Sequence, residues 1–327
     1  MGHRKHSQPR RGSMAYYPRV RAKRMTAHLR GWPEIESDQP QILAHAGFKA
    51  GCVQIVSIDD REHVPNRGKQ LVSLGTVIAT PPVTVIGVRG YSHDVNGLHA
   101  EFDVLADDIP KKISKYSRER SGTAVESARR MLPQISEIFA LLAVSPRMAG
   151  LEQKSPNMFE AAVRGGNVGA QFEFVVERLG SDLRFNDTFA LGSTVDVAAI
   201  SKGKGWQGVI RRMGAKRKQH KSRKTVREIG SLGPISPQNV MYTVPRAGQT
   251  GFHQRVEYNK RIMVMGEAEE ADVNPPGGFK HFGHVSGDYI ILRGSVPGPY
   301  RRMIKIRSPI RNIPSKVLRP NVLEVVA

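Results

Sequence analysis

The sequence has almost no cysteine and no long apolar run. Cys52 is the single cysteine among 327 residues, so no disulfide framework can form within the chain and we expect a reducing compartment. No run of 18 apolar residues occurs, and the basic N-terminus lacks the apolar core of a signal peptide. A membrane-surface helix needs an uninterrupted basic amphipathic stretch, but Gly and Pro interrupt the richest basic runs of this sequence. We therefore expect a soluble, cytoplasmic protein with no membrane partner.

Acidic residues are also scarce. Asp and Glu number 29 against 50 Lys and Arg, which gives a formal net charge of +21. Such an excess repels the folded chain from itself unless an anion neutralises it. Because the charges are concentrated in a few segments, nucleic acid is favoured over a basic enzyme with a solvated surface.

Motifs of familiar catalytic chemistry are missing. The sequence contains no G-x-S-x-G, H-E-x-x-H or G-x-x-x-x-G-K-[ST]. His281 and His284 form no recognised zinc motif, and one cysteine cannot make a cysteine-based metal site. Acidic pairs such as Asp59-Asp60 lie in turn-like, polar surroundings, and we interpret them as solvated. We predict no enzymatic activity, no metal, no cofactor and no small-molecule substrate.

The chain does contain many short runs rich in Val, Ile and Thr, bounded by Pro and Gly. This pattern predicts strands of an antiparallel sheet or barrel, in residues 51–59, 72–91, 100–106, 171–179, 193–200, 260–266, 281–298 and 301–309. Residues 111–148 differ, because Ile135, Ile138, Phe139 and Leu142 have helical spacing and predict a helical insertion in a β domain.

The predicted organisation has five parts. They are a basic arm that orders on its partner (1–40), a first part of the barrel (41–110), the helical insertion (111–165), the rest of the barrel (166–200 and 262–327) and a basic extension loop (201–261).

The stretch SKGKGWQGVIRRMGAKRKQHKSRK, residues 201–224, carries two conflicting signals. GKGWQG is a literal G-x-G-x-x-G, the fingerprint of a dinucleotide-binding turn. That turn needs a long helix after the third glycine and an acid about 20 residues on, yet Gly214 follows soon and KSRK stands where the acid belongs. No acid occurs between Asp196 and Glu228. We therefore predict that these glycines bring backbone close to phosphates, although a solvated charged loop is the alternative.

Several motifs in fixed order resemble one known family. KGKGWQGVIRRMG, IGSLGP, VPRAGQTGFHQRVEYNKRI, PGGFKHFG and LRGSVPGP are similar to the third universal protein of the large ribosomal subunit. HRKHSQPRRGSMAYYPRVRA and HAGFKAGC resemble its archaeal and eukaryotic branch, and we assign the archaeal type. The resemblance covers nearly the whole chain. It implies a translation-protein-type β-barrel bound to large-subunit ribosomal RNA, an extension threading toward the peptidyl transferase centre, a role in early assembly, and ribosomal protein neighbours.

Candidate RNA-binding residues follow from the charges and from the matched motifs. They are Arg4, Lys5, Arg10, Arg11, Lys202, Lys204, Trp206, Arg211, Arg212, Lys216, Arg217, Lys218, His220, Lys221, Arg223, Lys224, Arg227, Arg246, His253, Arg255, Lys260 and Arg261. The resemblance places the extension tip at Leu232, Gly233, Pro234 and Ile235. Many members carry Trp after this Gly-Pro, whereas Ile235 offers no π-face for stacking.

Two alternatives remain at this point. One is an RNA chaperone outside the ribosome, and the other is a basic nucleotide-dependent enzyme that uses the GKGWQG turn. Salt-resistant co-sedimentation with large subunits would separate the first from a ribosomal protein, and cofactor titration would separate the second.

Overall fold

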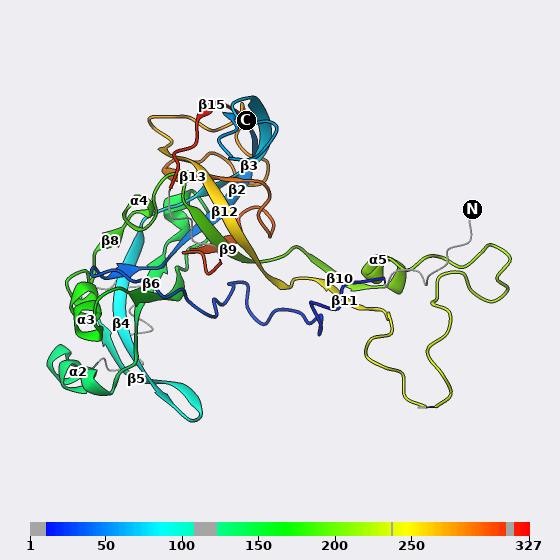
Figure 1. Cartoon of the computed structure of the whole chain (residues 1–327), viewed down its shortest axis with the longest axis horizontal. Helices are drawn as coiled ribbons and strands as arrows, with labels where there is room; N and C mark the ends of the chain where they lie inside the picture. Colours follow the sequence, from blue (N-terminus) through cyan, green and yellow to red (C-terminus); the bar gives the residue numbers. More distant parts are fainter. Residues whose placement is uncertain (1–10, 108–122, 237, 312–316) are drawn as a thin grey trace. The chain divides into compact units, whose positions relative to one another are not determined.

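The computed structural model describes residues 11–107, 123–236, 238–311 and 317–327 (Figure 1). The chain divides into two compact units. One combines the segment up to Met25 with Ile200–Gln254, and we call it the basic unit. The other, which we call the body, comprises Thr26–Ala199 and Arg255–Ala327. The predicted arm residues Arg4, Lys5 and Arg10 lie outside the described residues, and so do residues 108–122, which include the start of the predicted insertion at 111.

The body contains a closed barrel of six strands. These are β2 (Ala44–Ile58), β3 (Gln70–Ala79), β9 (Thr194–Ile200), β12 (Gln254–Glu267), β13 (Asp288–Arg293) and β14 (Met303–Arg307). The hydrogen-bonded order is β14-β9-β12-β13-β3-β2, and β14 also pairs with β2, which closes the barrel. β15 (Val322–Val326) adds to β2. The expectation of a mainly β fold is confirmed.

Alternation along the strands builds the barrel core. Val195 and Val197 on β9, and Ile304 and Ile306 on β14, are fully buried in one cluster. Phe185, on the short helix α4 (Phe185–Thr188), belongs to the same cluster. Since side chains alternate between the two faces of a strand, every second residue enters the core.

A second sheet in the body has the order β1-β7-β6-β4-β5, with β8 paired to β4. Its strands are β1 (Gln41–Ile42), β4 (Val83–Asp94), β5 (Gly97–Leu105), β6 (Glu137–Val144), β7 (Asn157–Arg164) and β8 (Asp182–Leu183). Helix α2 (Val125–Met131) and the 3₁₀ turns η1 (Leu132–Gln134) and η2 (Pro146–Ala149) lie on either side of β6 in sequence.

The predicted helix through Ile135, Ile138, Phe139 and Leu142 is wrong. Residues from Glu137 to Val144 form β6, a central strand that pairs with β4 and β7. All of β6 after Glu137 is buried. Since both of its faces are covered, the apolar run lacks the alternation of a half-buried strand, and its spacing also fits a helix.

The opposite error occurs at residues 171–179, which were predicted as a strand. Val168–Val176 form helix α3. Asn167 begins it, because its side-chain oxygen accepts a hydrogen bond from the Ala170 N–H at 2.7 Å. Phe172 and Val175, three residues apart, are fully buried, and Phe172 packs edge to face on Phe102 at 5.8 Å. The apolar run at residues 171–179 favoured a strand, but the cap and the buried helical face decide for a helix.

A buried ion pair joins distant segments of the body. Asp196 on β9 and Arg307 on β14 are 0% and 2% exposed. Arg307 Nη2 lies 3.3 Å from Asp196 Oδ2, and Arg307 Nη1 donates to the carbonyls of Arg30 and Gly31. Arg307 therefore binds both Asp196 and the backbone at Arg30 and Gly31, and so attaches this N-terminal segment of the body to the barrel.

The basic unit has little regular structure. β10 (Gly203–Gln207) pairs antiparallel with β11 (Gly248–Gly251), and the helix α5 (Val209–Met213) follows β10. No helix or strand occurs at residues 214–236 or 238–247, the long loop drawn between α5 and β11 in Figure 1.

Candidate nucleic-acid interface

The basic unit joins two segments that the sequence analysis had treated separately. The backbone N–H of Ala22 donates to the carbonyl of Phe252 at 2.8 Å, and Arg19 Nη1 donates to the carbonyl of Arg212 at 3.1 Å. The Arg21 guanidinium lies 5.2 Å from the centroid of the Phe252 ring. The described part of the arm is thus hydrogen-bonded to the extension in one unit.

His253, a predicted RNA-binding residue, lies at the centre of this junction. It is 9% exposed, its Nδ1 lies 2.8 Å from the Val20 carbonyl, and its Nε2 accepts from the Gly251 N–H at 3.1 Å. Since Nε2 accepts, Nδ1 is the ring nitrogen that donates to the Val20 carbonyl. His253 therefore joins the arm to the extension through Nδ1, while Nε2 accepts a hydrogen bond from within the extension.

The GKGWQG motif forms a strand edge instead of a turn around a ligand. Residues 203–207 are β10, and α5, which begins after Gly208, has five residues and ends at Gly214. A dinucleotide site needs a parallel βαβ unit with a long helix, so this geometry removes that interpretation. Gly251 has a φ of 72°, and a Cβ there would lie 2.0 Å from the Lys202 carbonyl oxygen, which makes glycine necessary in the paired strand.

Most predicted cations of the basic unit are exposed. The exposed members are Arg11, Lys202, Lys204, Arg211, Lys216, Arg217, Lys221, Arg223, Lys224, Arg227 and Arg246, together with His220. Trp206 on β10 is 76% exposed, and Lys218 is half-buried. Arg212 differs, since its guanidinium donates to the carbonyls of Gln249 and Arg246 at 3.0 Å each and ties α5 to β11.

Three predicted residues lie on β12 and belong to the body. β12 begins at Gln254, whereas the sequence pattern had the β structure resume near Ile262. Most side chains in its first half are polar, so the sequence there has no apolar run that predicts a strand. Arg255 is half-buried there, and Lys260 pairs with Glu257 at 2.6 Å.

The third of these residues, Arg261, pairs with an acid that was expected to be solvated. Its Nη1 donates to Asp60 at 2.7 Å, and this hydrogen bond lowers the pKa of the Asp60 carboxyl. The neighbouring Asp59 is 3% exposed, and a hydrogen bond from Arg61 lowers its pKa to about 2. The interpretation of this acidic pair as solvated is therefore wrong, because both carboxylates are held by arginines.

The predicted extension tip is open to solvent. Leu232 and Ile235 are 41% and 90% exposed, Pro234 is exposed, and Gly233 has a φ of 137°. Sequence reasoning missed Tyr242, which is 73% exposed further along the same loop. The short apolar run from Val240 to Tyr242 within a basic segment was the signal that could have identified it.

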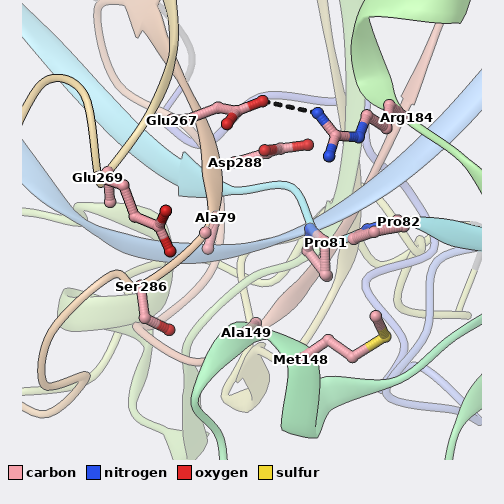
Figure 2. A pocket seen from close by; sticks show the side chains of 12 residues that line it. Ala79, Pro81, Pro82, Met148, Ala149, Arg184, Glu267, Glu269, Ser286 and Asp288 are labelled. Atoms are coloured by element: carbon pink, nitrogen blue, oxygen red, sulfur yellow. Dashed lines mark hydrogen bonds and ion pairs between the residues drawn. The ribbon is translucent and has the colours of Figure 1, made fainter.

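The charged side chains that line a pocket of about 270 Å³ in the body are mainly acidic, in contrast to the positively charged surface of the basic unit (Figure 2). Arg184 Nη1 donates to Glu267 at 2.6 Å, and Glu269 and Asp288 also line the pocket. Burial, and to a smaller extent the charges of Glu267 and Asp187, raise the pKa of Asp288. Three carboxylates around one arginine repel phosphates, so we assign this pocket no part in polyanion binding.

Two features are absent from the residues that the structure describes. None of their helices combines the length and the apolar character that crossing a membrane requires. They also contain no group of three or more His, Cys, Asp or Glu side chains placed to hold a metal ion.

Fold and surface together define a basic, mainly β protein. Residues 1–326 match the family described as Ribosomal protein L3. Proteins named large ribosomal subunit protein uL3 are 39% identical in Methanothermobacter thermautotrophicus (94% of this chain, 93% of the relative), 41% in Picrophilus torridus (92% and 91%) and 41% in Caldivirga maquilingensis (93% and 90%). The chain belongs to the ribosomal protein L3 family, as the sequence motifs had indicated, and these three relatives are archaeal proteins. Its family is one of structural proteins and not of enzymes.

Proposed function

We propose that this chain is a structural component of the large ribosomal subunit that binds large-subunit ribosomal RNA through its basic unit. It supports early assembly of the subunit and sends residues 201–254 toward the peptidyl transferase centre, while the body contacts neighbouring ribosomal proteins. As a member of its family the protein is located in the ribosome, in the cytoplasm.

The observation that carries the proposal is the charge of the basic unit. Between Ile200 and Gln254 there are twelve Lys and Arg but a single acid, Glu228. Most of these cations are exposed, in a segment with little regular structure. Uncompensated like charges at this density oppose a compact state, whereas phosphates of RNA neutralise them and release counterions.

The basic unit also has an exposed aromatic ring and an open stretch of backbone that RNA can contact. The exposed indole of Trp206 stands on β10 between Lys204 and the α5 cations, so a base can stack on it while its phosphate meets a lysine or arginine. Gly205, with a φ of 64°, has no atom near its absent Cβ, which leaves the backbone open to close approach.

The test measures how binding to a large-subunit RNA fragment depends on salt. We expect log affinity to fall linearly with log salt concentration, with a slope set by the phosphates neutralised. Changing Arg211, Lys216, Arg217, Lys221 and Lys224 together to Gln should reduce the slope by about 3–5 units, since each lost phosphate contact removes roughly 0.9. Arg212 is left intact because it ties α5 to β11.

A matched variant changes five exposed cations of the body to Gln: Arg67, Lys69, Arg147, Lys154 and Lys280. Its slope should fall less than that of the first variant. If the first variant is folded and its slope equals that of the unchanged protein, the basic unit is a solvated surface and the proposal is wrong.

A further inference from the structure

One exposed part of the basic unit has no assigned role. Tyr242 is 73% exposed, and the preceding Val240 and Met241 are 49% and 59% exposed. They lie in the loop between α5 and β11, several residues beyond the tip at Ile235. Neighbouring apolar side chains exposed together indicate a surface that a partner covers.

The ring of Tyr242 is held in position. It meets the ring of Tyr17 edge to face, with the centroids 6.2 Å apart and the planes at 67°. Tyr17 is itself fixed, because its hydroxyl lies 3.7 Å from Met213 Sδ and the Arg19 guanidinium lies 5.5 Å from its ring centroid. A ring fixed before binding loses less conformational entropy when a partner stacks on it.

The surroundings decide which partner fits. Tyr242 belongs to a unit in which Glu228 is the only acid among the described residues, so a protein partner would have to bury its contact beside many exposed positive charges. A nucleotide matches both properties, since its base offers a π-face and its phosphate meets the cations. In an A-form duplex the base faces are stacked inside the helix, and an unpaired base is needed.

We propose that Tyr242, braced by Tyr17, is a stacking platform for an unpaired base of the bound RNA. This inference rests on the proposed function, because the charged surface brings the RNA there. It gives the basic unit an aromatic contact beyond the tip, where Ile235 supplies no π-face.

The test uses the full protein and two RNAs of equal length, a large-subunit fragment with unpaired loops and a perfect duplex. Tyr242→Ala should weaken binding of the looped RNA by about 5- to 150-fold at every salt concentration, the range for loss of one stacked base, with the slope against log salt unchanged. Tyr242→Phe keeps the ring and should bind within about twofold of the unchanged protein. Binding of the duplex should be the same for all three proteins.

Met241→Ala is the matched control, since it removes a neighbouring exposed side chain without a π-face. Equal losses for Met241→Ala and Tyr242→Ala, or equal losses on looped and duplex RNA, would overturn the stacking platform. So would unchanged affinity of Tyr242→Ala in a protein that binds RNA with a normal salt slope. If the unchanged protein fails to bind either RNA, the proposed function falls together with this inference.

Discussion

Individual ionisable side chains inside the body are each matched to a different kind of partner. The Asp196 carboxylate accepts from Arg307 and from the backbone N–H groups of Asn259 and Ile310. Lys305 on β14 is 6% exposed and lies 5.1 Å from the centroid of the Phe159 ring, and burial lowers its pKa to about 8. The ring nitrogens of His45 on β2 lie 2.9 Å and 3.3 Å from the carbonyls of Ala46 and Leu183, but burial of the ring opposes its protonation.

His45 predicts a pH dependence of body stability. Its ring is 1% exposed beside Phe185, and burial lowers its pKa from 6.5 to about 4. Between these values the unfolded chain is protonated while the folded chain is not, so stability is full above pH 6.5 and falls as the pH drops toward 4. His45→Phe removes this proton-linked term, so the stability difference between the two proteins should change by about 2–3 kcal/mol from pH 7.5 to 4.5.

Urea unfolding measures this difference, followed by the fluorescence of Trp32 in a Trp206→Phe background. Other carboxylates contribute equally to both proteins and cancel in the subtraction. A difference that stays constant over this pH range would contradict the buried, neutral state of His45.

At the scale of elements, the β10–β11 pair controls how the loop of the basic unit begins and ends. Gly251→Ala places a Cβ 2.0 Å from the Lys202 carbonyl oxygen at a left-handed φ, so we expect the pair to open. Amide hydrogen exchange in Gly203–Gln207 and Gly248–Gly251 should become at least about tenfold faster.

Gly208→Ala is the control for that change. Gly208 has a φ of −65° and no atom within reach of an added Cβ, so its replacement should leave the exchange rates unchanged. Equal protection in the Gly251→Ala protein would show that the pairing does not depend on glycine at this position.

The elements also show what the sequence could and could not predict. β9 and β14 are buried along almost their whole length, but they were visible because polar residues stand between apolar ones in their sequences. β6 was missed since its residues after Glu137 are apolar without interruption, and the first half of β12 was missed since its side chains are mostly polar. Period alone cannot identify either kind of strand.

The candidate interface was partly predictable for a different reason. Its lysines and arginines were found because charge is a property of composition and needs no fold. The junction of arm and extension was not found, because the contact between His253 and the Val20 carbonyl joins residues 233 positions apart. The structural role of Arg212 was not found either. Its acceptors are the backbone carbonyls of Gln249 and Arg246, more than 30 residues further along the chain, and no side-chain pattern in the sequence marks them.

At the scale of the whole molecule, the two units should respond differently to a protease. Residues 214–236 have no helix or strand and carry many exposed basic residues, whereas the body has a closed barrel. In the RNA-free protein we expect trypsin to cut between Arg211 and Lys224 at least about tenfold faster than within the barrel.

Bound large-subunit RNA should slow cleavage in this segment and leave cleavage of the body unchanged. Mass spectrometry of the early fragments measures both rates. Resistance of residues 211–224 in the RNA-free protein would contradict an extension that depends on RNA for its order.

The pairing of β2 with β14 joins the first and the last strands of the barrel. During synthesis the chain leaves the ribosome from its N-terminus, so residues 200–254 emerge before Met303–Arg307 exist. Until β14 arrives, β2 lacks a neighbour on one edge and the barrel stays open, and contacts of such long sequence separation form slowly. If the basic unit binds RNA as proposed, its cations are available to RNA in each new chain before the last strand that closes the barrel has been made.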